Sequence, residues 1–219
     1  MYSYSEPYKK YPNVQRIALP RANPLTQANL GQTILRRRSE RDFAPIPLLL
    51  EELSTLLYYG AGITHPQEGL RAAPSAGALY PIEIYLHVHH ISSLEKGVYH
   101  YAYPDHSLEL LKEGDYRTEV KRFALGQGMV TRAAVNLVLT AVMPRLTWKY
   151  RDRSLRYVYM EAGHIGQNIY LVATALGLGA CAVGAFNDNA LNHVLDIDGD
   201  AERVVYLLTV GRLARSQGV

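Results

Sequence analysis

One segment limits what this chain can fold into: residues 155–178 repeat apolar side chains at the spacing of a long amphipathic helix. The apolar positions alternate between intervals of three and four, which places them on one side of an α-helix. This stripe consists of Leu155, Val158, Ala162, Ile165, Ile169, Val172 and Leu176. A helix of this length extends ~35 Å, which is enough to cross a whole domain.

The opposite side of this helix lacks the charges of a solvent-exposed surface. It presents Gly163, Gly166, Gln167, Tyr170 and Ala173. A helix that is covered on just one side carries charged residues on its other side. We therefore expect this helix to be covered on more than one side. It is then either a core helix alone or a core helix that also forms a dimer interface, and the second reading is slightly favoured.

Strands and helices alternate irregularly along the rest of the chain. Alternating or buried apolar runs predict strands at 82–90, 97–103, 106–112, 134–143, 177–186 and 203–211. Start and stop residues predict four helices. Three are at 26–38, 115–125 and 187–196, and another one ends near Gly60. Because there is no strict strand–helix–strand repeat, the order favours an α+β domain over a doubly wound sheet.

Length and composition restrict the class of protein. The chain has 219 residues, a net charge of +3 and one Cys, which excludes an internal disulfide framework and a multi-Cys zinc site. No apolar run reaches ~18 residues, and the first residues form no apolar signal segment, so we expect no membrane span and a cytoplasmic location. We divide the chain into an N-terminal arm, residues 1–25, and one domain, residues 26–219.

The basic residues are clustered, and 17 of them are Arg against 6 Lys. The first cluster contains Arg36, Arg37, Arg38, Ser39 and Arg41. Guanidinium groups and a hydroxyl are the donors that a phosphate monoester requires. A solvated surface patch is the alternative reading of the same spacing.

The second basic cluster lies between residues 145 and 156, with Trp148 and Tyr150 interleaved. Such mixtures occur in proteins that bind nucleic acids. The low net charge and the lack of a recognition motif argue against a nucleic-acid partner here. A basic rim around an anionic ligand and an ordinary surface are the remaining readings.

Three short patterns are similar to known site motifs but stand in the wrong context. Ser75 lies in a possible nucleophile elbow that lacks its leading Gly and precedes a strand. The segment GLGACAVG is not a dinucleotide fingerprint, and Cys181 within it is expected to be a small buried residue. His87 and His89 share one side of a strand without a nearby carboxylate or Cys, so we expect a strand surface and no metal site.

Taken in order, several segments resemble one family. RRSERDF at 37–43, the PSAGALYP loop and EAGHIGQNIYLVATALGLGACAVGAF resemble the nitroreductase-like FMN oxidoreductases. PSAGALYPIEIYL and WKYRDRSLRYVYMEAGHIGQN resemble the SagB-type dehydrogenase branch, which includes oxidases that convert thiazolines and oxazolines of ribosomal peptides into thiazoles and oxazoles. The resemblance covers residues 35–211. It implies a central, mixed, mainly antiparallel sheet flanked by helices, with the long helix at a homodimer interface.

The resemblance also implies an FMN site. The residues that would hold the FMN phosphate and ribityl chain are Arg37, Arg38 and Ser39. Arg41 would reach the phosphate or the pyrimidine edge of the flavin. A further basic phosphate ligand of the family, after the last strand, matches only Arg212 and Arg215.

Two loops and one helix position would lie against the flavin if the resemblance holds. The partner subunit would supply Pro74, Ser75, Ala76 and Gly77. The segment along the isoalloxazine face would be Val183, Gly184 and Ala185. Gln167 would lie near the flavin and the dimer axis.

Lys149 and Tyr150 match the Lys–Tyr pair that is taken as the acid–base site of the azoline-oxidising members. Oxidation of an azoline removes a ring proton as well as a hydride, and a cation beside a Tyr hydroxyl favours the ionised form that accepts a proton. On a helix, consecutive side chains diverge by ~100°. We therefore expect only one of the two side chains to face the flavin.

Three functions fit the resemblance. The first is a SagB-type dehydrogenase that oxidises azolines in peptides by hydride transfer through flavin N5, and the Lys–Tyr pair favours it. The second is an NAD(P)H-dependent reductase of nitro or quinone compounds. The third is a flavin-binding partner protein without turnover. All three imply FMN and a homodimer, and the first two imply a small-molecule or peptide substrate.

Overall fold

Seven strands form one sheet in the computed structural model, which describes residues 6–214. Their order across the sheet is β1 (Arg16–Ala18), β6 (Ser107–Glu113), β5 (Gly97–Ala102), β4 (Ile82–Val88), β7 (Val135–Val142), β9 (Glu202–Arg212) and β8 (Leu178–Val183). Each neighbouring pair is antiparallel. The α+β class and the mainly antiparallel sheet expected from the sequence are confirmed.

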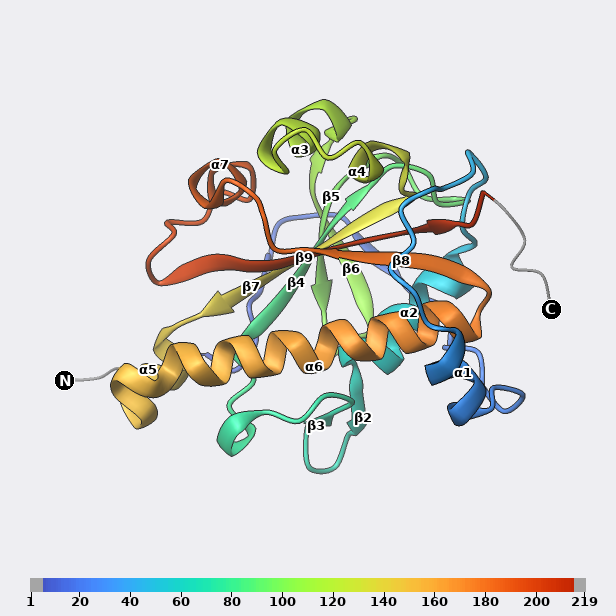
Figure 1. Ribbon diagram of the computed structural model, residues 1–219. Helices are drawn as coiled ribbons and strands as arrows, with labels where there is room; N and C mark the ends of the chain where they lie inside the picture. The colour runs from blue at the N-terminus through green and yellow to red at the C-terminus, as the bar shows by residue number, and fades with distance from the viewer. Residues whose placement is uncertain (1–5, 215–219) are drawn as a thin grey trace.

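Helices cover both faces of the sheet (Figure 1). On one face lie α1 (Leu30–Arg36), α2 (Leu50–Ala61), α5 (Pro144–Tyr150) and α6 (Ser154–Ala175). On the other face lie α3 (Arg117–Phe123), α4 (Met129–Arg132) and α7 (Asp188–Val194). The central strand β4 is buried on both sides, because Ile84 and Leu86 face α6 while Tyr85 faces the second layer.

The long helix expected from the apolar stripe is α6, which spans 22 residues along the sheet. Five members of the stripe are buried, namely Val158, Ala162, Ile165, Ile169 and Val172. Leu155 in the first turn is instead 37% exposed. Along the other side Gly166, Tyr170 and Ala173 are buried, so the second half of α6 is covered on more than one side. Gly166 permits this because a Cβ atom there would lie 2.9 Å from the Tyr206 ring.

Several boundaries differ from the sequence-based expectation. The first helix begins at Leu30 because the Asn29 side chain caps it by accepting a hydrogen bond from Gln32 N at 3.0 Å. The segment between α2 and β4, for which the sequence predicted no strand, contains a hairpin of β2 (Ile63–His65) and β3 (Leu70–Arg71). The basic segment 145–153, for which the sequence indicated no helix bounds, forms α5 and a short 3-10 turn.

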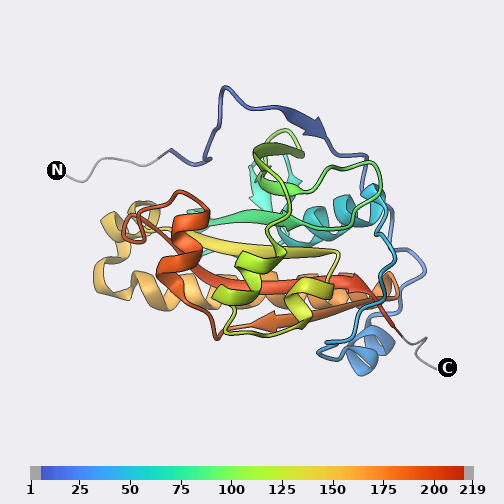
Figure 2. The same ribbon diagram turned by 90° about the horizontal axis from the view of Figure 1, so that it is seen from above.

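Residues 6–18 of the N-terminal arm pack on the sheet of their own chain (Figure 2). Strand β1 pairs with β6 at the sheet edge, and Arg16 forms an ion pair with buried Glu109 at 2.6 Å. Lys9 reaches further in, where its Nζ donates to the Tyr85 hydroxyl at 2.7 Å and pairs with Glu202. The arm therefore neutralises carboxylates that the sheet buries. The first five residues of the arm, and Arg215 in the tail, lie outside the described residues.

The expectation that His87 and His89 lie on a strand surface is wrong. Their side chains are 0% and 2% exposed, because α3 and α4 cover this face of the sheet. Burial lowers the pKa of His87 to about 3 and that of His89 to about 4. Both side chains are therefore neutral members of the core. No helix within residues 6–214 is long and apolar enough to cross a membrane.

Candidate active site

The first candidate group is built around Tyr170 of α6. Its hydroxyl oxygen accepts a hydrogen bond from Ala182 N of β8 at 2.6 Å and lies 3.0 Å from the Ser39 hydroxyl. The guanidinium of Arg37 lies 5.3 Å from the centre of the Tyr170 ring. Glu40 N donates to Ala180 O at 2.8 Å. The segment after α1 therefore contacts both α6 and β8 around the Tyr170 side chain.

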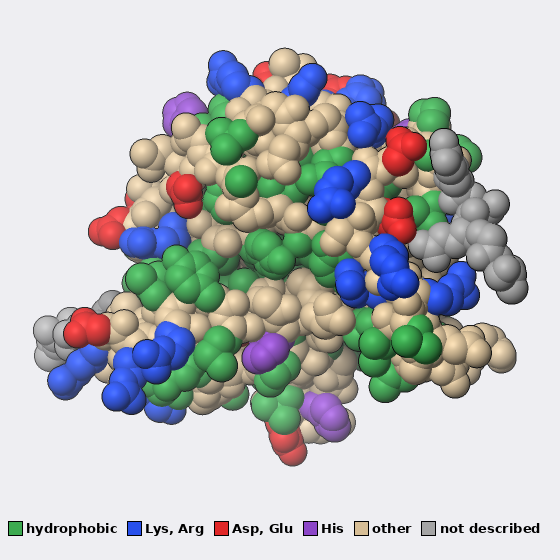
Figure 3. Space-filling view, in the orientation of Figure 1, with side chains coloured by type: hydrophobic (Ala, Val, Ile, Leu, Met, Phe, Trp, Pro, Cys, Tyr) green, Lys and Arg blue, Asp and Glu red, His purple; other side chains and the backbone are tan. Residues whose placement is uncertain are grey.

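The other two arginines of this segment are exposed and held by backbone carbonyls. Arg38 donates to Leu35 O at 2.7 Å, and Arg41 donates to Ser39 O at 3.2 Å. Figure 3 shows basic side chains gathered over α1 and, separately, over α5 and the start of α6. The first of these groups has the guanidinium and hydroxyl donors that a phosphate ester requires.

Arg212 lies at the end of β9 and forms an ion pair with a residue of α2. Its guanidinium pairs with Glu52 at 2.8 Å and donates to Pro47 O at 3.3 Å. Glu52 also accepts a hydrogen bond from Leu49 N at 2.8 Å and so caps α2. Within the described residues, the structure gives Arg212 a role in holding the start of α2.

The segment proposed to pass along the flavin begins where β8 ends. Val183 is buried as the last residue of β8, and Gly184 and Ala185 are exposed. No atom lies within 4 Å of a Cβ placed on Gly184, and Ala185 O accepts a hydrogen bond from Gln127 at 3.0 Å. Gln167 is exposed on α6. Cys181 in β8 is 1% exposed, as expected for a small buried residue.

The second candidate group is built around Gly77. The loop is closed by Ser75, whose hydroxyl accepts from Tyr80 N at 2.9 Å, and Gly77 has a positive φ of 63°. A Cβ atom on Gly77 would lie 2.7 Å from Lys149 Nζ and 2.8 Å from the Tyr150 hydroxyl oxygen. The tips of both side chains therefore converge on the space beside this glycine.

This convergence differs from the expectation that only one side chain of the Lys–Tyr pair faces the site. Lys149 and Tyr150 form the last turn of α5, and Lys149 Nζ lies 5.3 Å from the centre of the Tyr150 ring. The Tyr150 ring packs against Tyr157 of α6, with 4.6 Å between ring centres. The long Lys side chain reaches back toward the Tyr, which overcomes the angle between their Cα positions.

Sequence reasoning missed Glu161, which lies beside the same loop. Its side chain is on the buried side of α6 with a residue exposure of 3%, and one carboxyl oxygen has no hydrogen-bond partner among the described residues. Burial raises the pKa of Glu161 to about 7, while Ser75, Arg71 and Arg145 oppose the shift. The signal was present in the sequence, because position 161 follows Val158 by three residues and precedes Ile165 by four.

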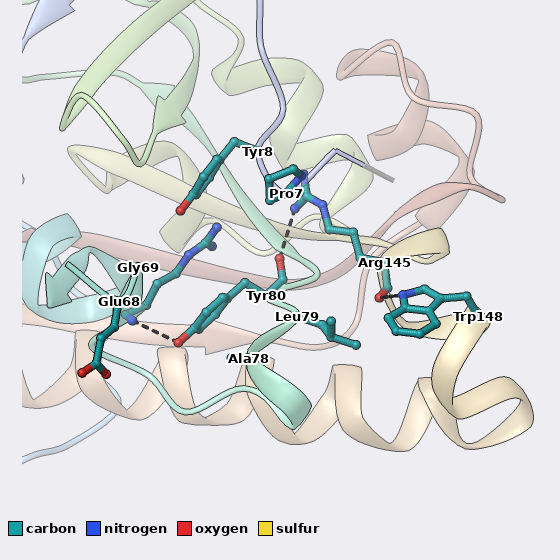
Figure 4. A pocket seen from close by; sticks show the side chains of 10 residues that line it. Pro7, Tyr8, Glu68, Gly69, Ala78, Leu79, Tyr80, Arg145 and Trp148 are labelled. Atoms are coloured by element: carbon teal, nitrogen blue, oxygen red, sulfur yellow. Dashed lines mark hydrogen bonds between the residues drawn. The ribbon is translucent and has the colours of Figure 1, made fainter. Parts of the chain in front are cut away.

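The sequence left the basic cluster that contains Arg145 as either a rim around an anionic ligand or an ordinary surface, but Arg145 is buried and positions α5. Its guanidinium pairs with Glu83 at 2.6 Å and donates to Tyr80 O at 3.1 Å (Figure 4). It also donates to Glu6 O at 2.9 Å. The start of α5 is thereby joined to β4, to the loop after Gly77 and to the N-terminal arm.

The two candidate groups lie toward opposite ends of α6. Tyr157 marks the Lys149–Tyr150 group and Tyr170 marks the Ser39 group. At the rise of an α-helix, these two positions are ~20 Å apart. The structure therefore brings together the members of each group but keeps the two groups apart within one chain.

Comparison with known proteins gives consistent matches. A family model described as the nitroreductase family matches residues 34–212. A protein of Methanocaldococcus jannaschii named as a nitroreductase is 40% identical over 188 residues, which are 86% of this chain and 93% of that protein. A crystal structure of a protein named as a nitroreductase from Anabaena variabilis has a TM-score of 0.82 and 31% identity, and it covers 94% of this chain and 43% of that one.

Two further relatives are named for the processing of trifolitoxin and of microcin B17. The trifolitoxin-processing protein TfxB of Rhizobium leguminosarum is 31% identical over 77% of this chain. The microcin B17-processing protein McbC of Escherichia coli is 27% identical over 69% of it. The matches span 49% and 57% of those two proteins, so this chain corresponds to about half of each. The family model matches most of this chain, and the chain is 40% identical to nearly the whole M. jannaschii protein. We conclude that the chain belongs to the nitroreductase family.

Proposed function

We propose that this protein is an FMN-dependent oxidoreductase of the SagB type that oxidises azoline rings in peptides. The observation that carries this proposal is the convergence of Lys149 Nζ and the Tyr150 hydroxyl beside Gly77. It places a cation and an ionisable hydroxyl at one point, as a proton-abstracting site requires. The relatives named for trifolitoxin and microcin B17 processing support a peptide substrate.

The donors around Tyr170 fit the phosphate end of FMN. Arg37 lies over the Tyr170 ring, and the Ser39 hydroxyl lies next to the Tyr170 hydroxyl. A guanidinium and a hydroxyl from two nearby residues are therefore held beside the same Tyr side chain. Arg38 and Arg41 are exposed beside them. The open space at Gly184 allows a flat group to approach the backbone after β8. Bound FMN would supply the hydride acceptor for the reaction.

In the proposed reaction, one ring carbon of the azoline loses a hydride and the neighbouring ring carbon loses a proton, so that a ring double bond forms. The Tyr150 oxygen would accept the proton. The Lys149 ammonium lies on the same side of Gly77, so it would place a positive charge beside this oxygen. The Tyr157 ring would keep the Tyr150 ring in place.

We further propose that the site is completed in a homodimer. The exposed surfaces of α1 and α6 carry large apolar side chains, which are Leu30, Ile34, Leu35, Leu155, Tyr159 and Met160. Patches of this kind mark interaction surfaces. A twofold axis across α6 would place the Ser39 group of one chain near the Gly77 group of the other, because each group lies toward its own end of the helix.

An NAD(P)H-dependent reductase of nitro or quinone compounds is the second candidate. The 40% identity to a protein named as a nitroreductase favours it. This reaction would use the same FMN site. It would not require proton abstraction by Tyr150.

The absorption spectrum of the purified protein tests the cofactor, and two assays then separate the candidates. We expect flavin bands, together with conversion of a thiazoline-containing peptide to its thiazole and a mass loss of two hydrogens. Protein that binds no FMN would contradict both candidates. Rapid NADPH oxidation with a nitroarene, without thiazoline oxidation, would support the reductase and overturn the azoline proposal.

A further inference from the structure

A cavity of about 160 Å³ lies between the N-terminal arm, the β2–β3 hairpin, the turn that follows Gly77 and α5. Each of these elements contributes to its wall. Figure 4 shows Tyr8 of the arm, Tyr80 of the turn, and Arg145 and Trp148 of α5 around the cavity. The hairpin contributes Arg71.

The two arginines of this cavity differ in their partners. Arg145 is bonded to Glu83, Tyr80 O and Glu6 O, and so has a structural role. Arg71 is only 8% exposed, and one terminal nitrogen donates to Ile82 O at 3.3 Å. Its Nε and its other terminal nitrogen have no hydrogen-bond partner among the described residues.

These two unpaired nitrogens form one edge of the guanidinium. A buried donor without a partner costs free energy, and a buried charge costs more. The Nε edge of an arginine presents two parallel N–H groups, which match the two oxygens of a carboxylate in a bidentate pair. An unpaired edge of this kind, on a side chain that lines a cavity, indicates a ligand that carries a carboxylate.

Three aromatic rings surround the guanidinium of Arg71 and give it no hydrogen-bond partner at this edge. The guanidinium carbon lies 3.7 Å from the centre of the Tyr103 ring, 4.7 Å from that of Tyr80 and 5.5 Å from that of Tyr8. Rings stacked on a guanidinium stabilise the cation through its faces and leave the edge for hydrogen bonds. They also provide apolar walls for the group attached to a carboxylate.

The neighbouring carboxylates of this chain do not occupy the edge. Glu83 is held by Arg145 at 2.6 Å and by His100 at 3.1 Å. Glu161 is near enough to Arg71 for the guanidinium to oppose its pKa shift, but burial still raises the pKa of Glu161 to about 7, so its negative charge is weakened. The five residues that precede Glu6, MYSYS, contain no acidic side chain.

We propose that Arg71 is the anchor of a substrate subsite that binds a free carboxylate. The inference rests on the proposed function, because the cavity adjoins the proton-abstracting site. Ala78 and Trp148 line the cavity, and they are the chain neighbours of Gly77 and Lys149. The substrate class is then an azoline whose ring or short peptide carries a carboxylate, held by Arg71 while the ring lies near Tyr150.

Binding of benzoate to the FMN-loaded protein tests the subsite without turnover, and benzamide is the neutral control of the same shape. Ligand-observed NMR or calorimetry should detect benzoate and show benzamide binding at least about tenfold weaker, as expected for loss of a charge-assisted pair. Equal binding of the two, or tighter binding of inorganic phosphate than of benzoate, would overturn the proposal.

Arg71→Lys keeps the charge and removes the paired donors, so it should weaken benzoate binding about tenfold or more. Arg71→Gln should abolish the preference for benzoate over benzamide. Arg122→Gln, which changes an exposed arginine of α3, is the matched control and should bind benzoate as the unchanged protein does. If both Arg71 variants fail to fold, the benzoate-to-benzamide comparison on the unchanged protein decides alone.

Turnover separates this inference from the proposed function. A thiazoline carboxylate should show a KM about tenfold below that of its amide, with a similar kcat, and Arg71→Lys should remove the difference. Benzoate should compete with the acid. Equal KM values for acid and amide would overturn the substrate role of Arg71 and leave the oxidation itself intact. Benzoate binding without any azoline oxidation would instead overturn the proposed function while the carboxylate site stands.

Discussion

The Ser39 hydroxyl lies 3.0 Å from the Tyr170 hydroxyl, which ties the first basic cluster directly to the long helix α6. The same Tyr170 oxygen accepts a hydrogen bond from Ala182 N, so one phenol group joins a loop, a helix and a strand. The position of the arginines that would hold a phosphate therefore depends on a side chain 131 residues away in the sequence.

Tyr170→Phe tests this relationship. The change removes one oxygen, so Ala182 N loses its acceptor and Ser39 loses its neighbour. The free energy of unfolding should fall by about 1 kcal/mol, which corresponds to a decrease of about 2–4 °C in Tm for a domain of this size. Thermal unfolding followed by circular dichroism measures it. Tyr159→Phe, on the exposed side of the same helix, is the control, and equal Tm values for the two variants would contradict the role of Tyr170.

Arg37→Ala should lower FMN affinity about tenfold or more, because a phosphate would lose a charge-assisted hydrogen bond. The neighbouring Arg36→Ala removes the same side chain from the last turn of α1 and serves as the control. Flavin fluorescence during titration with FMN measures both dissociation constants. An unchanged constant for Arg37→Ala would remove this residue from the phosphate site.

Tyr150→Phe should slow azoline oxidation by ~10²–10⁴, the usual contribution of a positioned acid–base group. FMN content should remain unchanged, because the Tyr150 ring still packs against Tyr157. Stopped-flow reduction of the flavin by a thiazoline substrate gives the rate. If the phenylalanine variant reacts at the original rate, Tyr150 does not abstract the proton.

Gly77→Ala should abolish oxidation, because the new methyl group would lie 2.7 Å from Lys149 Nζ and 2.8 Å from the Tyr150 oxygen and would displace both. Gly126→Ala is a closely matched control. Gly126 also has a positive φ, of 78°, but no atom lies within 4 Å of its added Cβ. Both changes should cost about 1–2 kcal/mol of backbone strain, measured by urea unfolding. A similar activity in the two variants would show that Lys149 and Tyr150 need not approach Gly77.

Glu161→Gln should change how stability depends on pH. The pKa of Glu161 is raised by burial to about 7 in the folded state from 4.5, so the folded state holds this proton over that interval while the unfolded state releases it. The contribution of Glu161 to stability is therefore full below pH 4.5 and decreases as the pH rises to 7, by about 3 kcal/mol in total.

Urea unfolding of the Glu161→Gln variant between those two pH values should lack this decrease. Glu51→Gln, in the exposed first turn of α2, should keep it. Parallel pH profiles for the unchanged protein and Glu161→Gln would contradict a raised pKa.

Periodicity predicted the elements whose patterns were long. The stripe of α6, the alternation of β4 and the continuous apolar run of β7 are each long enough that their type was clear from local sequence. Strand β1 and helix α4 are too short to carry a period, and α5 is filled with basic and aromatic residues that follow no stripe. Strand β1 is held by pairing with β6, and α5 is held through Arg145 by Glu83 and the arm, which are contacts made by residues distant in sequence.

The candidate site likewise contains residues that local sequence identified and residues that the fold revealed. The Ser39 segment was identified from its residue types, whereas the roles of the Gly77 loop and of the Lys149–Tyr150 pair came from the resemblance to a known family. Each of these motifs is continuous in the chain, so it can be recognised without the fold. Glu161 and Arg71 were missed, because their importance comes from burial without a full set of partners. Glu161 keeps the spacing of the buried stripe of α6, so its burial could have been inferred from the sequence. The burial of Arg71 depends on which distant segments cover it, and no local pattern records that.

The sequence by itself determined that the chain is an α+β protein with one domain-length helix, and which short motifs carry guanidinium, hydroxyl and amine groups. These properties follow from local periodicity and side-chain chemistry. Only the tertiary structure decided that Lys149 and Tyr150 meet beside Gly77, that Arg145 is buried against Glu83, and that Arg71 lines a cavity with two nitrogens unpaired. The reason is that distances between side chains are set by packing between distant segments, which fixes both the approach of charges and their removal from water.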